Sequence, residues 1–410
     1  FQTFYERRVM QILSRCIIYT SFTTLVLCQT LDIETLEGLV IERNLHLLAS
    51  LKQIDIQQGY YDQSKKLQNP SIEIESNSAV ESESSVMVSQ KILLGGKRKL
   101  KIRLYELELT KSHFEHEKLK HEKLTEAFQS FVEILHLQEI KVLQNNRIFS
   151  VLELLNAVSK KVEAGKLSPA EKSRVKIRHF NEQMKLRVTD KSLKTAWLSI
   201  TTMWGDEKSS FDFAEGDLRK LSMLPLSYSF KNSPLIQFAE LSVEIQQNKI
   251  KSEKAIAIPN FSLGAGLKQS DIPGNTFQIG LSVPLPIFNR NQGNIKSAVY
   301  ELEKAELELK ATESELKSKI INIQSELELL FSETITLKDD IIPESLNAYT
   351  IITDGYLNGR FTYLDVVDAQ KMWFQSREQY LNVLTEYHQK FFELDYLTGN
   401  KMHKNFKENN

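Results

Sequence analysis

The chain has 410 residues, with 52 basic and 53 acidic side chains and a formal net charge of −1. That balance argues against a nucleic-acid-binding protein, which normally has a strongly basic face. Hydrophobic residues make up 41% and charged residues 26%, which indicates a folded chain. With only two cysteines, a disulfide scaffold or a cysteine-rich zinc site is excluded, and the few glycines (15) and prolines (9) favour long helices.

The first residues have the pattern of a secretory signal peptide. Arginines up to Arg15 precede an apolar run over 16–28, which is too short to span a membrane as a helix. We expect residues 1–28 to be a signal peptide. Lipidation of Cys28 is the alternative, although Leu27 stands where lipid attachment prefers a small residue.

The rest of the chain reads as one structural unit that occurs twice. Pro70 and its neighbours recur around Pro259, and the segment around Gly165 recurs around Gly359, at offsets of 189 and 194. We therefore expect a first repeat over 29–204 and a second over 231–400. A linker is predicted over 205–230, and a polar tail over 401–410. Each repeat is predicted to contain a helix, two strands, a very long helix, a tight turn and a helix.

Two β-hairpins of alternating polarity are predicted, over 70–91 and 259–284. The period of two is clearest in the second hairpin, where glycine, serine and glutamine alternate with apolar residues. The flanking helices supply no further layer to cover a sheet, so we expect the apolar face to contact lipid and the polar face to line a lumen. The predicted lipid-facing residues are Phe261, Leu263, Leu267, Phe277, Ile279, Leu281 and Val283.

The long helices show a coiled-coil pattern. Leucine or isoleucine recurs every seven residues from Leu302 to Leu337, and Ile320, Leu327 and Ile341 occupy the alternate position. The corresponding helix of the first repeat lacks proline over 97–164 and would be roughly 100 Å long at 1.5 Å per residue. Pro343 is expected to kink or break the second long helix. The chain is therefore predicted to be elongated.

Both long helices are predicted to end in tight turns. Gly165 and Gly359 suit the left-handed conformation that closes a helix. Ser168, with glutamate three residues later, and Thr362, with Asp365 three residues later, have the pattern of capping boxes.

Four amphipathic strands cannot close a barrel, because known membrane barrels begin at eight strands and open edges are not tolerated in lipid. Three chains would supply twelve strands and twelve helical rods around a lumen. The predicted fold class is mainly α with a small β part: a duplicated unit of long coiled-coil helices and two β-hairpins. It would trimerise into a 12-stranded outer-membrane β-barrel on a periplasmic α-helical barrel.

These features, together with three motifs, resemble the TolC-like outer-membrane efflux proteins, and within them the heavy-metal and multidrug branch that includes CusC and CzcC. The motifs are QKILLGGKRK (90–99), LSVPLPIFNRNQGN (281–294) and YLNGRFTYLDVVDAQ (356–370), and the resemblance covers about residues 31–400. It implies a homotrimer in the outer membrane of a Gram-negative bacterium, extending into the periplasm. An inner-membrane pump, proton-driven, would open it through a periplasmic adaptor protein.

The resemblance also implies roles for individual residues. The adaptor-docking tips correspond to Gly165, Lys166, Leu167, Ser168, Gly359, Arg360, Phe361 and Thr362. The family's periplasmic aperture corresponds to Asp365 and Asp368, which a spacing of three places on one helical face. In a trimer they would form two acidic rings that favour cations. The alternatives are helix capping for Asp365 and simple solvation for Asp368.

Other candidate chemistry is weak. His116 and His121 on the long helix do not have the spacing of a zinc-protease motif, and neighbouring lysines indicate a solvated face. Gly95 and Gly96 lack the rest of a phosphate loop and fit a turn from strand to helix. The basic run over 97–103 would lie near the inner lipid surface or on a solvated face. We expect no enzyme activity, no cofactor, no metal site and no nucleic-acid partner.

The predicted function is an outer-membrane exit duct of a tripartite efflux system, which passively conducts substrates from the pump. Heavy-metal cations are the preferred cargo, on the strength of the resemblance alone. The alternatives are a duct for type I protein secretion and a periplasmic coiled-coil scaffold without a pore.

Overall fold

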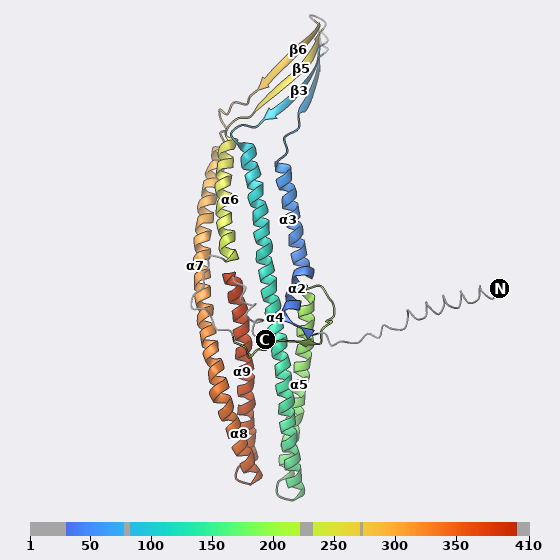
Figure 1. Cartoon of the computed structure of the whole chain (residues 1–410), viewed down its shortest axis with the longest axis vertical. Helices are drawn as coiled ribbons and strands as arrows, with labels where there is room; N and C mark the ends of the chain where they lie inside the picture. The colour runs from blue at the N-terminus through green and yellow to red at the C-terminus, as the bar shows by residue number, and fades with distance from the viewer. Residues whose placement is uncertain (1–29, 78–82, 222–232, 271–273, 400–410) are drawn as a thin grey trace, which may run out of the picture.

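The structure is a computed structural model that describes residues 30–77, 83–221, 233–270 and 274–399. The predicted signal peptide, with Cys28, and the predicted tail over 401–410 lie outside the described residues. An elongated helical bundle carries a small sheet at one end and two tight helical turns at the other (Figure 1). The described chain is thus mainly helical with a small β part, as the sequence predicts.

The elements repeat in one order along the chain. They are β1 (Thr30–Leu31), α2 (Ile33–Arg43), α3 (Leu45–Ser64), β2 (Ser71–Asn77), β3 (Glu83–Ile92), α4 (Lys97–Glu163), α5 (Pro169–Thr202), β4 (Phe213–Ala214), α6 (Pro234–Ile256), β5 (Phe261–Ser270), β6 (Gly274–Ser282), α7 (Gln292–Thr336), the π-helical turn η2 (Leu337–Ile341), α8 (Ile342–Leu357) and α9 (Tyr363–Thr398). A helix, two strands, a long helix and a final helix therefore occur both before and after β4.

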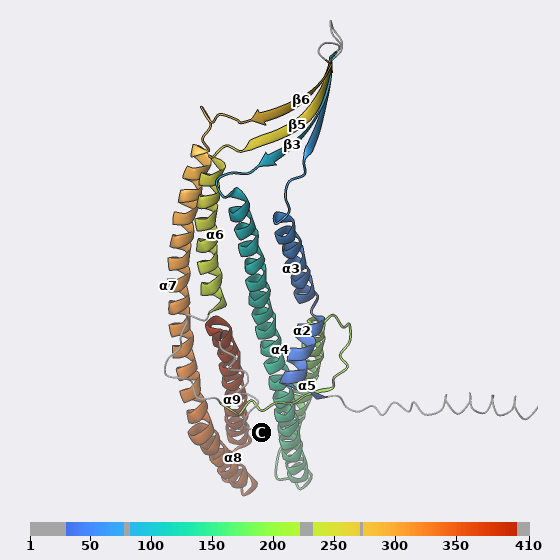
Figure 2. The same ribbon diagram turned by 45° about the horizontal axis from the view of Figure 1, so that its top comes forward.

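The helices stand in columns below the sheet (Figures 1 and 2). Helix α4 packs against α3 and α5 on one side and against α6 and α9 on the other, while α7 and α8 lie beyond α6 and α9. The strands follow the same order, β2, β3, β5 and β6, because each strand continues the column of the helix next to it in the chain. Within the described ranges, every helix is too short or too polar to cross a membrane.

The main core lies near the middle of the bundle. It joins α2, α4, α7 and α9 and includes Phe131, Leu327, Leu384 and Tyr387, each of which is 0% exposed. Burial of a large apolar side chain contributes about 1.5–3 kcal/mol, so this cluster is a principal source of cohesion between the columns. The predicted seven-residue repeat of α7 contributes to this core, since Leu316, Leu327 and the other buried positions of the repeat pack in it.

The long helix of the second repeat bends where proline is predicted to disturb it. Pro343 follows η2, in which the backbone N–H of Ile342 bonds to the carbonyl of Leu337, five residues earlier. The prediction that Ile341 belongs to the buried seam is wrong, because its side chain is 43% exposed. The π turn inserts one residue into the helical register, so the seam continues after Leu337 with the partly buried Ile342, five residues later, and the buried Ser345, eight residues later.

Residues 205–221, the described part of the predicted linker, form a belt across the middle of the bundle. Strand β4 pairs in parallel with β1, and Gln138 of α4 both donates to the Ala214 carbonyl and accepts from the Ala214 N–H, at 2.9 Å each. Arg219 makes a two-pronged contact with Glu139, at 2.6 and 3.2 Å. His388 of α9 bonds to the Leu218 carbonyl at 2.8 Å. The belt is therefore an integral part of the core and ties α4 to α9.

The sheet is antiparallel and has one apolar face. Rows of paired residues cross all four strands, such as Ile74, Val86, Leu267 and Phe277 in one row. Apart from Ile92 and Phe261 at the helical end, the large apolar side chains of the strands on this face are 48% to 73% exposed, so no described part of the chain covers most of it. The opposite face carries serine, glutamate and glycine, with Met87 lying over Gly264 and Gly280.

Candidate functional site

Both helical tips have the same backbone design. Gly165 and Gly359 have φ angles of +70° and +78°, the left-handed conformation that only glycine adopts without strain. At the first tip, the N–H of Lys166 bonds to the Lys161 carbonyl at 2.8 Å. At the second, the N–H of Arg360 bonds to the Gly355 carbonyl at 2.7 Å. Each tip is thus a Schellman motif that satisfies the free carbonyls at a helix end.

The helix after each tip begins with a capping residue, but the two caps differ. Thr362 Oγ1 accepts from the Asp365 N–H at 3.3 Å, and Asp365 accepts from the Thr362 N–H at 2.8 Å, which completes the predicted capping box. Ser168 accepts from the Ala170 N–H at 3.2 Å. Glu171 instead contacts Arg174, at 3.3 Å, so the predicted reciprocal box is absent at the first tip.

Most of the predicted docking residues lie on the surface of the tips. Gly165, Lys166 and Ser168 are exposed at the first tip, as are Gly359, Arg360 and Thr362 at the second. Leu167 is half-buried against the apolar cluster between the tips. Phe361 is 40% exposed, and its ring lies so close to Gly355 that a Cβ there would be 2.2 Å from it. Phe361 is therefore held against its own hairpin and stays partly exposed.

The two tips are joined to each other. Lys161 of α4 donates to the carbonyls of Tyr356 and Leu357 at the end of α8, at 3.1 and 3.2 Å. Its ammonium also lies 4.7 Å from the centre of the Tyr356 ring. A buried cluster that includes Val158, Val175 and Tyr363 fills the space between them. The tips therefore form one unit in the isolated chain.

Two buried tyrosines near the tips were not identified from the sequence. Tyr356 and Tyr363 are 4% and 8% exposed, and burial raises the pKa of both hydroxyls, with Glu171 raising them further. Arg178 opposes this rise at Tyr363, where it donates a hydrogen bond. A tyrosine on an apolar helix face is usually interpreted as part of the core. The only sequence signal for a special position of Tyr356 is that it lies three residues before Gly359.

The two predicted aperture residues are both exposed on the first turns of α9. Hydrogen bonds from Thr362, through its side chain and backbone, lower the pKa of Asp365. Asp365 therefore belongs to the capping box whose N-cap is Thr362, and Asp368, one turn later on the same face, is not required by that box. Capping does not bar Asp365 from a second role, because its carboxylate remains exposed.

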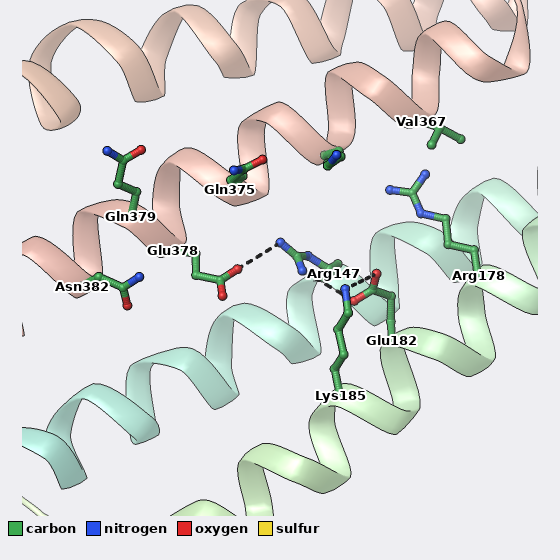
Figure 3. Close-up of a pocket in the computed structure, with 10 residues that line it drawn as sticks. Arg147, Arg178, Glu182, Lys185, Val367, Gln375, Glu378, Gln379 and Asn382 are labelled. Atoms are coloured by element: carbon green, nitrogen blue, oxygen red, sulfur yellow. Dashed lines mark hydrogen bonds and ion pairs between the residues drawn. The ribbon is translucent and has the colours of Figure 1, made fainter.

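A groove of about 620 Å³ opens between α5 and α9 over α4 (Figure 3). Arg147 of α4 lies at its floor, 3.6 Å from Glu182 of α5 and 3.5 Å from Glu378 of α9, and 5.1 Å from the ring of Phe374. Lys185 also contacts Glu182, at 3.3 Å. This network was not predicted, because its members come from three helices far apart in sequence.

The predicted lipid-facing residues share the apolar face of the sheet. Phe261 is half-buried, and the other six are 46% to 72% exposed. At the far end of the polar face, Lys268 and Glu83 form an ion pair at 2.6 Å. The sheet therefore has one apolar face and one polar face, and no described part of the chain covers the exposed apolar side chains.

His116, one of the histidines of the long helix, has a structural contact. His116 shares a hydrogen bond with Ser50 of α3 at 2.7 Å, and burial lowers its pKa. Among the residues that the structure describes, no group of three or more His, Cys, Asp or Glu side chains is arranged to hold a metal ion. Gly95 and Gly96 have φ angles of +70° and +72° and make the turn from β3 into α4, as predicted.

Comparison with known proteins connects this geometry to a family. Residues 226–400 match the model of the family described as outer membrane efflux protein. The chain is 28% identical over 376 residues to the cobalt-zinc-cadmium resistance protein CzcC of Cupriavidus metallidurans, covering 90% of each chain. The fold matches a structure of CusC (TM-score 0.78, 14% identity, covering 90% of this chain and 92% of that one). It also matches the outer-membrane channel OprN (TM-score 0.78, 13% identity, 90% of each).

Proposed function

We propose that this chain, a member of the outer membrane efflux protein family, is the outer-membrane exit duct of a tripartite efflux system and works as a homotrimer. It lies in the outer membrane and extends into the periplasm. Substrates pass through it passively, since the energy is supplied by an inner-membrane pump, proton-driven, through a periplasmic adaptor. The chain is not an enzyme in this scheme, and it needs no cofactor.

The observation that carries this proposal is the uncovered apolar face of the sheet. Strands β2 and β6 are the edges of a four-stranded sheet, and within the described chain neither has a partner on its outer side. In water, a large apolar side chain left exposed forgoes about 1.5–3 kcal/mol of burial. In lipid, the apolar face is in a favourable environment, but the backbone groups of the two open edges still lack hydrogen-bond partners. Three chains that join β6 to β2 would close twelve strands and satisfy both.

The helical layer supports the same closure. Helix α7 carries a second stripe, Tyr300, Leu307 and Ile321, at multiples of seven residues, and these side chains are 50% to 65% exposed. At the opposite edge of the layer, α3 exposes Ile56 and Tyr60, at 49% and 54%. Since α3 continues β2 and α7 continues β6, a ring that joins the strands also brings these two helix flanks together. The result would be an α-helical barrel below the β-barrel.

The tips would dock the adaptor, and the first turns of α9 would form the entrance. Both tips are held in shape by their own backbone hydrogen bonds and are solvent-exposed, which suits a surface that a partner must recognise without a large ordering cost. Asp365 and Asp368, repeated three times, would place two acidic rings at the periplasmic mouth and favour cations. Heavy-metal cations are accordingly the proposed cargo, which also agrees with the resistance described for the relative CzcC.

Extraction and conductance test the proposal together. The mature chain should require detergent, elute as a trimer, and form cation-selective pores in planar bilayers. A chain that is monomeric and soluble in buffer would instead support the scaffold alternative. Deleting the protein should then sensitise its host to metal salts more than to dyes or antibiotics. Sensitivity to dyes alone would keep the duct and remove the metal cargo, while loss of a secreted protein would support the secretion alternative.

A further inference from the structure

The level at which the strands meet the helices is strongly basic. The residues that form it are 61–67, 89–101, 251–260 and 284–296, and they contain eleven basic and two acidic side chains. The basic residues, which we call the basic collar, are Lys65, Lys66, Lys91, Lys97, Arg98, Lys99, Lys101, Lys251, Lys254, Arg290 and Lys296. The whole chain is nearly neutral, so this concentration is local.

The two acidic side chains of this level are already engaged. Asp62 contacts Lys65 at 3.1 Å, and the Glu253 carboxylate accepts from Asn291 at 2.6 Å. Several collar residues bond only to neutral oxygens: Arg98 donates to the Lys65 carbonyl at 2.8 Å, and Lys97 donates to Asn260 at 2.6 Å. These bonds fix the four column ends at one level but leave the positive charge uncompensated.

An apolar loop lies beside the collar. Residues 284–288, which we call the proline loop, connect β6 to α7 and expose Leu285, Ile287 and Phe288 at 75%, 62% and 90%. The loop is held in shape, because Ile287 bonds to the Leu285 carbonyl at 2.9 Å and Arg290 donates to the Pro286 carbonyl at 3.3 Å. Prolines at 284 and 286 further restrict it. The hydrogen bonds and the two prolines therefore hold these large apolar side chains in exposed positions.

We propose that the basic collar and the proline loop bind the anionic phospholipids of the periplasmic leaflet. The inference rests on the proposed function, because the apolar sheet places this level at the inner edge of the membrane. The exposed cations would pair with lipid phosphates, and Ile287 and Phe288 would enter the acyl region beside the headgroups. Charge complementarity selects an anionic lipid over a zwitterionic one, because the eleven basic side chains of this level far exceed its two acidic ones, and of these two only Asp62 pairs with a collar residue, Lys65. A basic first turn at α4, where the helix dipole is also positive, is stabilised by the same anions.

Lipid retention measured by native mass spectrometry tests the charge. The detergent-solubilised full chain is offered phosphatidylglycerol and phosphatidylcholine, and the wild type should retain the first preferentially. Each basic side chain near an anionic surface contributes roughly fivefold, so R98Q/K99Q/K101Q should weaken phosphatidylglycerol binding about a hundredfold. The matched control K176Q/K191Q/K194Q removes the same charge from α5 and should change little. Equal loss in both triple variants, or no preference in the wild type, would overturn the assignment.

A second pair of variants tests the loop. I287S/F288S should weaken the binding of both lipids and leave the trimer intact in detergent, whereas I177S/F180S, on the exposed face of α5, should do neither. If I287S/F288S instead dissociates the trimer without altering lipid binding, the loop packs on the neighbouring copy and the lipid assignment is wrong. Conductance separates these outcomes from a failure of the proposed function: a pore-forming wild type without lipid preference contradicts this inference alone.

Discussion

Removal of Arg147 should weaken the lower bundle more than removal of any exposed ion pair. The guanidinium lies between Glu182 and Glu378 and is the only basic group of the described chain that contacts carboxylates on both α5 and α9 there. The variant R147M keeps the length of the side chain and its contact with Phe374. It leaves the Glu182 carboxylate, whose side chain is 7% exposed, paired only with Lys185.

The expected loss is set by how far each carboxylate is buried. Breaking a buried pair costs about 3–5 kcal/mol, whereas an exposed pair is worth at most about 1 kcal/mol. Glu378 is 42% exposed and adds little, and Lys185 offsets part of the loss at Glu182. We therefore expect R147M to lower the free energy of unfolding by about 3 kcal/mol. For a chain of this size the midpoint of thermal unfolding should fall by about 3–6 °C.

Circular dichroism of the detergent-solubilised protein during heating measures this shift. The double variant R147M/E182Q removes the orphaned charge and should recover more than half of the lost stability. K141M is the matched control. Lys141 of α4 pairs with Asp190 of α5 at 2.8 Å, so this pair joins the same two helices as Arg147 and Glu182, but both of its side chains are about 40% exposed. If K141M costs as much as R147M, or if E182Q brings no recovery, the buried network does not have the role assigned to it.

Three further predictions concern the tips and the belt. T362V removes the cap of α9 at a cost of about 0.5–2 kcal/mol, so amide exchange in its first turn should accelerate about 2-fold to 30-fold, and unchanged exchange would refute the cap. D368N should lower the cation preference of the pore without altering that exchange, whereas an effect on both would assign Asp368 to helix stability. Burial lowers the pKa of His388 below its usual 6.5, so its contribution to stability is complete above that pH and is lost as the pH falls towards the lower folded value. H388Q should flatten the dependence of the unfolding midpoint on pH between 7.5 and 5.5, and an unaltered slope would contradict this.

Patterns within one short segment could be predicted from the sequence. The hairpins follow from a period of two, and their apolar face follows from the alternation itself, as at Leu267 and Phe277. The tips follow from glycine at the left-handed position and from the Thr362 cap. In each case the residues that decide the structure lie within about ten positions of one another. Local chemistry is sufficient there.

Features that depend on distant partners could not be predicted in this way. The two-residue strands β1 and β4 carry no periodic signal, and the acidic and serine-rich residues after Trp204 resemble a linker. Gln138 holds the belt in the core, because its side-chain amide bonds to both the N–H and the carbonyl of Ala214, as the backbone of a paired strand would. The Arg147 network likewise needs three helices to be in place. A side chain that acts across more than thirty residues leaves no mark in a local pattern.

The bend at Pro343 shows how a single residue changes the partner of a whole helix. A seven-residue repeat keeps one stripe of α7 against its neighbours down to Leu337, and a strict continuation would have buried Ile341. Proline cannot donate the next helical hydrogen bond, and the π turn absorbs this defect by adding one residue to the turn. The added residue rotates everything below it by about 100°, so that Ser345 and Tyr356 take over the seam. The upper stripe therefore packs into the central core, while the lower one joins the cluster between the tips. One chain segment can thus belong to the rigid middle of the bundle and to its entrance, with the change of register as the boundary between them.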